Sequence, residues 1–121
     1  METLRDDVVA VVDDDPSVLD SLRFLLEVVG YRVRIYLSAE SYLDDISRDP
    51  ACLILDHHMP RVSGLELVEQ LRAAGKGVPV LLITGSPSAD LAARAARLGV
   101  QMLEKPLSET ELLGFVQAHL C

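Results

Sequence analysis

The sequence contains few cysteines and few basic residues. Two of its 121 residues are cysteines, Cys52 and Cys121, which is too few for a disulfide framework or a cysteine-rich metal site. Eleven Lys and Arg residues stand against 19 Asp and Glu residues, and the net charge is −8. Binding to nucleic acid needs a basic face that contacts phosphates, so we expect no direct nucleic acid binding by this domain.

Long apolar segments are also missing. No apolar run approaches the ~18 residues of a membrane span, and the first residues include Glu2, Asp6 and Asp7 where a signal peptide would be apolar. We therefore expect a cytoplasmic protein with no membrane contact. Half of the residues are hydrophobic, which allows a real core, and 121 residues fit one domain over 1–121.

Short apolar runs alternate with helical patterns along the chain. The runs predict five strands, at residues 8–12, 31–36, 51–55, 78–83 and 100–103, and the second has the alternating polarity of an edge strand. A helical pattern follows each of them. This alternation predicts an α/β domain with right-handed crossovers and a doubly wound, five-stranded parallel sheet.

Capping signals and apolar spacing bound the predicted helices. Asp15 is expected to cap the first helix, with Pro16 at its first position and Gly30 at its end. Its buried stripe would comprise Val18, Leu19, Leu22, Leu25, Leu26 and Val29. The second helix would begin at Ser38, include Tyr42, Leu43 and Ile46, and end at Asp49-Pro50. Residues 108–111 predict a capping box for the last helix.

Three predicted strands end at polar residues. Asp13 and Asp14 follow the first strand, Asp56 follows the third, and Thr84 follows the fourth. In a flavodoxin-like sheet of order 2-1-3-4-5, the first and third strands are neighbours at the switch point, where their carboxylates would converge. Three ionised carboxylates in a small volume require a cation, and all-oxygen ligands favour Mg²⁺. With Lys105 after the fifth strand, these groups suit phosphoryl transfer.

Five short motifs stand in the order of a known family. They are Val12-Asp13-Asp14-Asp15, Asp56-x-x-Met59-Pro60, Ser63-Gly64, Thr84-Gly85 and Lys105-Pro106. In these motifs the sequence resembles the receiver domain of two-component response regulators over nearly its whole length. Ser38-Ala39-Glu40, Ile83-Thr84-Gly85 and Glu104-Lys105-Pro106 are most similar to the FixJ-type regulators.

The resemblance implies a role for each site residue. Asp56 would accept a phosphoryl group from the phosphohistidine of a sensor histidine kinase. Asp14 would bind Mg²⁺ directly and Asp13 would help through water, with Asp56 and the backbone carbonyl of His58 as further ligands.

The resemblance also implies how a bound phosphoryl group would be contacted and sensed. Thr84 and Lys105 would contact its oxygens, and the Lys105-Pro106 bond would be cis. Phosphorylation would then change partner or homodimer contacts on the face of the fourth helix, fifth strand and fifth helix. The output would be transcriptional control through a domain absent here, without enzymatic activity beyond phosphorylation and dephosphorylation of the domain itself.

Two residues depart from the usual pattern of the family. Met102 stands three positions before the lysine, where an aromatic residue is usual, and we expect it to be a passive filler. His58, two positions after the phosphoacceptor, is an uncommon residue there, and its side chain would overlook the site.

Three alternative functions fit parts of the sequence. Asp56-His57-His58 matches the signature of metal-dependent phosphoesterases, although His119 is the only other histidine. Asp13 and Asp15 have the spacing of aspartate-nucleophile phosphatases, which need a second Asp for acid catalysis. A receiver-like interaction module that is never phosphorylated is the third alternative.

Overall fold

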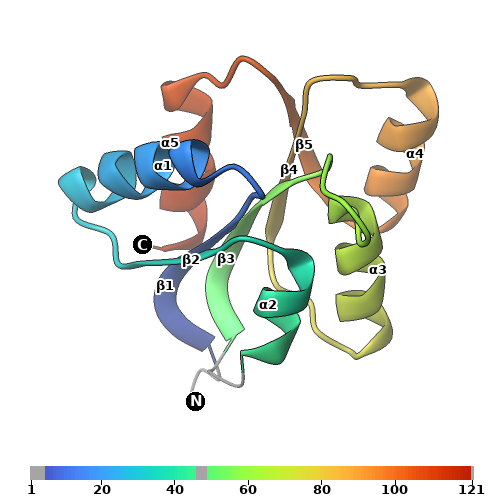
Figure 1. Ribbon diagram of the computed structural model, residues 1–121, viewed down its shortest axis with the longest axis horizontal. Helices are drawn as coiled ribbons and strands as arrows, with labels where there is room; N and C mark the ends of the chain where they lie inside the picture. Colours follow the sequence, from blue (N-terminus) through green and yellow to red (C-terminus); the bar gives the residue numbers. More distant parts are fainter. Residues whose placement is uncertain (1–4, 46–48, 121) are drawn as a thin grey trace.

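A computed structural model of the chain describes residues 5–45 and 49–120, and Figure 1 shows its arrangement. Ile46, which was expected in the second helix, and Cys121 lie outside these residues. Five parallel strands form one sheet in the order β2-β1-β3-β4-β5. Helices α1 and α5 cover one face, and α2, α3 and α4 cover the other. The predicted fold class and strand order are therefore confirmed.

Each strand is followed by one helix. The elements are β1 (Arg5–Val12), α1 (Pro16–Val29), β2 (Val33–Tyr36), α2 (Ala39–Asp44), β3 (Asp49–Asp56), α3 (Gly64–Ala73), β4 (Val80–Thr84), α4 (Ala89–Arg97), β5 (Gln101–Glu104) and α5 (Glu109–His119). None of the described helices is long and apolar enough to cross a membrane.

The core forms two layers because side chains alternate along each buried strand. On β3, Cys52 and Ile54 pack toward α1 and α5, whereas Leu53 and Leu55 pack toward α2, α3 and α4. Cys52 is fully buried, as expected, and burial raises the pKa of its thiol to about 12. Since both faces are covered, the buried parts of the central strands are apolar, and polar residues stand only at the two ends of each strand or just beyond them.

Helix α1 begins and ends where the sequence predicts, but its buried stripe is shorter. Asp15 is the N-cap and accepts a hydrogen bond from the Ser17 N–H, and Gly30 caps the C-terminus in the left-handed conformation with φ 112°. Leu26 is fully buried, whereas Val29 is 51% exposed. The stripe therefore stops one turn before the helix ends, and the prediction of a buried Val29 was wrong.

Strands β1 and β3 begin earlier than predicted because their pairing extends them. Strand β1 begins at Arg5 instead of Val8, and the start of β3 pairs with it. Asp49 and Pro50 belong to β3, although they were predicted to end the second helix, which stops earlier at Asp44. Proline is tolerated at the start of a strand, so a helix-ending signal was in fact a strand-starting one.

A complete capping box occurs at α3, where the sequence analysis did not predict one. Ser63 Oγ accepts from the Glu66 N–H at 3.2 Å, and a Glu66 carboxylate oxygen accepts from the Ser63 N–H at 2.8 Å. At α5, the Ser108 hydroxyl accepts from the Glu111 N–H, which is the first half of such a box. The start of α3 is thereby fixed directly beyond the loop that follows β3.

Candidate functional site

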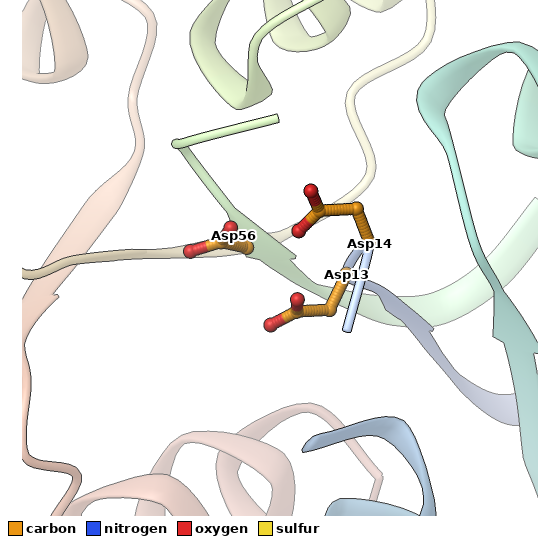
Figure 2. A group of neighbouring side chains, drawn as sticks. All are labelled: Asp13, Asp14 and Asp56. Carbon is orange, nitrogen blue, oxygen red and sulfur yellow. The ribbon is translucent and has the colours of Figure 1, made fainter. Parts of the chain in front are cut away.

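Three carboxylates meet where β1 and β3 end. The pairing of Val12 with Leu55 brings the next residues of each strand, Asp13 and Asp56, to the same edge of the sheet. Figure 2 shows Asp13, Asp14 and Asp56 beside one another, and one ligand oxygen of each lies within 4.8 Å of the others. We call these three residues the acidic cluster. Asp13 and Asp56 are buried and Asp14 is exposed, so the cluster is reached from the side of Asp14.

The cluster concentrates more negative charge than its surroundings neutralise. Burial raises the pKa of Asp13 to about 6, and the neighbouring charges of Asp56 and Asp14 act in the same direction. The Asp15 N–H, which donates to Asp13 Oδ1 at 3.0 Å, opposes that shift, and so does Lys105. The ionised carboxylates of the cluster therefore repel one another, and a bound cation would relieve that repulsion.

Lys105 supplies the nearest positive charge. Its Nζ lies 3.1 Å from Asp56 Oδ1, and its side chain remains 40% exposed. Burial alone would lower the pKa of Lys105, but the carboxylates of Asp56, Asp13 and Asp14 outweigh it and raise the pKa. Apart from this ion pair, Asp56 Oδ1 has no hydrogen-bond partner in the described part of the chain. The Lys105-Pro106 peptide bond is cis, as the resemblance implied.

The donor set of the acidic cluster fits a hard divalent cation such as Mg²⁺. Carboxylate oxygens are the ligands that this ion prefers, and the exposed Asp14 leaves room for the waters that it retains. Asp13, Asp14 and Asp56 would hold it, and the His58 carbonyl remains a predicted ligand. Asp13 and Asp56 are the least exposed carboxylates of the cluster, so a bound cation would stabilise their ionised forms most.

Thr84 ends β4 beside Asp56. Its side chain is fully buried, and its Oγ1 accepts a hydrogen bond from the Ser86 N–H at 3.0 Å. The same oxygen lies 2.8 Å from Nε2 of His58. From the sequence we expect the His58 side chain to overlook the site, but the bond to Thr84 has no counterpart among those predictions. The only sequence signal was the position of His58, two residues beyond a strand that neighbours β4.

The loop after β3 is fixed by His57 and Gly64. The His57 N–H donates to the Ile83 carbonyl at 2.9 Å, its carbonyl accepts from the Gly64 N–H at 3.0 Å, and its Nδ1 accepts from the Leu65 N–H at 3.3 Å. Burial lowers the pKa of His57, with His58 contributing. A Cβ on Gly64 would lie 2.5 Å from the Asp56 carbonyl oxygen. Only glycine therefore lets α3 start this close to the end of β3.

A second contact holds the middle of that loop. Arg61 adopts φ 66°, in the left-handed region that is unfavourable for a residue with a side chain. Its Nε donates to a Glu40 carboxylate oxygen at 2.8 Å. The ion pair connects the start of α2 to the loop that carries His58.

All of the predicted site residues lie at the C-terminal edge of the sheet or in the loop just beyond it. The structure does not add to these residues the histidine ligands that the phosphoesterase alternative would need. Within residues 5–45 and 49–120, the potential metal-ligand cluster contains no histidine. His119 lies on α5 and packs against Phe115, with ring centroids 4.8 Å apart.

Comparison with known proteins identifies a consistent set of relatives. A family model described as the response regulator receiver domain matches residues 9–117. Response regulator protein TodT of Pseudomonas putida is 38% identical over 118 residues, which cover 96% of this chain and 52% of that protein. Transcriptional regulatory protein FixJ of Azorhizobium caulinodans is 40% identical over 114 residues, covering 93% and 54%.

The solved structures agree with these relatives. The crystal structure of FixJ-N is similar with a TM-score of 0.84 at 31% identity, over 96% of this chain and 94% of that one. The chain thus spans about half the length of the two curated relatives but nearly all of FixJ-N.

Proposed function

Since the chain belongs to the receiver domains of two-component response regulators, of the FixJ and TodT type, we propose that it accepts a phosphoryl group on Asp56. One observation carries this proposal. Asp56 is a buried carboxylate that ends a central strand, faces Lys105 at 3.1 Å and shares its surroundings with Asp13 and Asp14. A carboxylate in that position can act as a nucleophile, while Lys105 and a cation on the neighbouring carboxylates would stabilise the negative charge of the incoming group.

The transfer is a displacement at phosphorus. A bond forms between an Asp56 carboxylate oxygen and phosphorus, and the bond from phosphorus to the donor's imidazole nitrogen breaks and returns its electrons to the donor. Lys105 Nζ is already paired with Asp56, so it can also contact the phosphoryl oxygens and stabilise their negative charge. The Thr84 hydroxyl would donate to one of those oxygens.

The acidic cluster would bind Mg²⁺ for this step. Asp14 and Asp56 would be direct ligands with the His58 carbonyl, and Asp13 would act through water. The ion supplies positive charge that lets an anionic donor approach an anionic acceptor. The protein's own contribution is to hold the three carboxylates within reach of one another. The ionised form of Asp13 is less favourable there, because burial and the neighbouring carboxylates raise its pKa.

Membership of the family supports a proposal for the partners. The phosphoryl donor would be a sensor histidine kinase, and phosphorylation would change contacts on the face of α4, β5 and α5, including those of a homodimer. The wider protein would regulate transcription through a domain other than this one, and a cytoplasmic location belongs to the same proposal. The domain itself would catalyse only its own phosphorylation and dephosphorylation.

The test uses a small phosphodonor and the mass of the intact protein. Incubation with Mg²⁺ and acetyl phosphate should add one phosphate to the unaltered chain and none to Asp56→Asn. Asp20→Asn, which changes an exposed carboxylate on α1, is the matched control and should be phosphorylated normally. Equal incorporation in Asp56→Asn would refute the acceptor assignment. Sustained turnover of phosphoesters would instead indicate a phosphatase, and no reaction would indicate a pure interaction module.

A further inference from the structure

His58 and Thr84 are joined by a hydrogen bond between their side chains. Nε2 of His58 lies 2.8 Å from Oγ1 of Thr84, and the Ser86 N–H donates to the same oxygen at 3.0 Å. Thr84 is fully buried, whereas His58 is exposed. The exposed His58 ring is therefore bonded to the buried hydroxyl of Thr84, which is the one polar group of that side chain.

The backbone around that hydroxyl is held from both sides. The Thr84 carbonyl accepts from the Lys105 N–H at 2.9 Å, and the preceding Ile83 carbonyl accepts from the His57 N–H at 2.9 Å. Strand β4 lies between β3 and β5 in the sheet. The Thr84 hydroxyl can therefore change its partners most readily by rotation of its own side chain, which moves no ladder hydrogen bond.

The His58 ring and a phosphoryl group on Asp56 would both bond to the Thr84 hydroxyl. A hydroxyl has one hydrogen to donate and two lone pairs, and the Ser86 N–H already occupies one lone pair. His58 takes either the hydrogen or the second lone pair, depending on which ring nitrogen is protonated. The proposed function requires the same hydroxyl to donate to a phosphoryl oxygen on Asp56. When Nε2 is unprotonated and accepts the hydrogen, the ring and the phosphoryl group compete for that hydrogen.

We propose that His58 is a positioning residue, whose Nε2 accepts the Thr84 hydroxyl hydrogen and holds Thr84 in the orientation of the unphosphorylated state. This inference rests on the proposed function of Asp56. Phosphorylation has to break or redirect the bond between His58 and Thr84 before the hydroxyl turns to the phosphoryl group. By linkage, the free energy by which this bond stabilises the unphosphorylated state lowers the affinity for a phosphoryl-like ligand by the corresponding factor.

The experiment measures binding of beryllofluoride, which on a carboxylate mimics a phosphoryl group, with Mg²⁺ present. Four proteins form a double-mutant cycle: the unaltered chain, His58→Ala, Thr84→Val and the double variant. His58→Ala should bind beryllofluoride about three- to tenfold more tightly, the range expected for one side-chain hydrogen bond. In the Thr84→Val background, which has no hydroxyl, the same change at His58 should have no effect on affinity.

A second readout does not depend on ligand affinity. In His58→Ala without ligand, the backbone amide signals of Thr84 and Ser86 should shift part of the way toward their positions in the beryllofluoride complex. His58→Gln, whose amide can still bond to the hydroxyl, should stay within about twofold of the original affinity. A ring that merely fills space would produce neither the partial shift nor the rescue by glutamine.

The outcomes separate this inference from the function on which it rests. If the unaltered chain binds no beryllofluoride, the proposed function fails and the role of His58 fails with it. If the unaltered chain binds but His58→Ala binds equally or more weakly, only the role of His58 is overturned. The same holds if the gain in affinity persists in the Thr84→Val background.

Discussion

The two halves of the site are built differently. The acceptor half consists of the acidic cluster at the ends of β1 and β3, two central strands. The sensing half consists of Thr84 on β4 and Lys105 after β5, an edge strand whose residues are exposed or half-buried. Asp13 and Asp56 are placed by the pairing of β1 with β3. The Thr84 hydroxyl is oriented by its bonds to the His58 ring and the Ser86 N–H, and Lys105 Nζ by its ion pair with Asp56.

This difference matches the work that each half would do. A phosphoryl acceptor and its metal ligands need a fixed geometry, because small displacements weaken transfer strongly. Groups that report phosphorylation need at least two accessible arrangements, and rotation of the Thr84 and Lys105 side chains can supply them while the backbone stays held. Substitutions in the acceptor half should therefore change stability and ion binding, and those in the sensing half should change coupling.

The largest effect is expected for Gly64→Ala, which disturbs the acceptor half. The new Cβ would lie 2.5 Å from the Asp56 carbonyl oxygen and 2.8 Å from Cα of His57, and backbone cannot move aside cheaply. We expect a loss of about 3 kcal/mol in the free energy of unfolding, measured with urea. Gly114→Ala on α5 is the control. No atom lies within 4 Å of its added Cβ, so it should gain about 0.5–1 kcal/mol. Similar losses in both variants would contradict the packing argument.

Asp13→Asn should stabilise the protein when no divalent ion is present. The folded pKa of about 6 lies above the ordinary 3.8, so the folded state binds the proton more tightly than the unfolded state does. The cost of ionising Asp13 is fully present above about pH 6 and vanishes as the pH falls toward 4. We expect a gain of about 2 kcal/mol at pH 7.5 in the presence of EDTA, and little gain below pH 4.

Mg²⁺ should reverse the ranking at pH 7.5, because it stabilises the unaltered chain more than Asp13→Asn. Urea unfolding at both pH values, with and without Mg²⁺, measures all of these terms. Asp20→Asn, on the exposed face of α1, should show neither dependence. A gain that is equal at both pH values would rule out relief of charge repulsion as its cause.

Asp14 and Asp15 are adjacent but should respond differently to substitution. Asp15 accepts from the Ser17 N–H at 2.9 Å as the cap of α1, so Asp15→Ala should cost about 1 kcal/mol and keep Mg²⁺ binding. Asp14→Ala should abolish Mg²⁺ binding and leave the melting temperature without the ion nearly unchanged. Calorimetric Mg²⁺ titrations and thermal unfolding test this pair, and the reverse pattern would show that the direct ligand had been assigned to the wrong aspartate.

The smallest effect is expected for Met102→Ala in the sensing half. Met102 pairs with Leu82 on β4 and is half-buried, but its flexible side chain can fill space in several rotamers. Phosphorylation-dependent association should change less than about threefold in Met102→Ala and about tenfold or more in Thr84→Ala. Thr84→Ser keeps the hydroxyl and should retain the coupling. Loss of coupling in Met102→Ala alone would make methionine the switch.

Much of the fold was predictable because its signals are local. Buried runs such as 51–55, the Asp15 cap and the Gly30 stop each specify one element, and alternation of strands with helices specifies the sheet. The boundaries at Asp49 and Pro50 were mispredicted because their partners on β1 are distant in sequence. Val29 was mispredicted because helical periodicity does not tell how far the covering layer extends.

The site was predictable in its composition but not in its contacts. The identity of Asp13, Asp14, Asp56, Thr84 and Lys105 followed from their positions at strand ends, and the structure brings them to one edge. Their chemical roles stay predictions. Lateral contacts depend on how neighbouring strands align and how loops fold back, which no local pattern encodes. The bond between the His58 ring and the Thr84 hydroxyl is such a contact.

The pairing of β1 with β3 also bears on how the site comes into existence during folding. Val12 and Leu55 are register partners, yet α1, β2 and α2 lie between them in the chain. Closing so long a loop is entropically costly and is repaid only when the surrounding core has formed. A peptide that carries Asp56 with its flanking residues should therefore take up no phosphate. In a refolding experiment, phosphate uptake should appear together with the last cooperative step, so acetyl phosphate becomes a chemical probe for native chains in a mixed population.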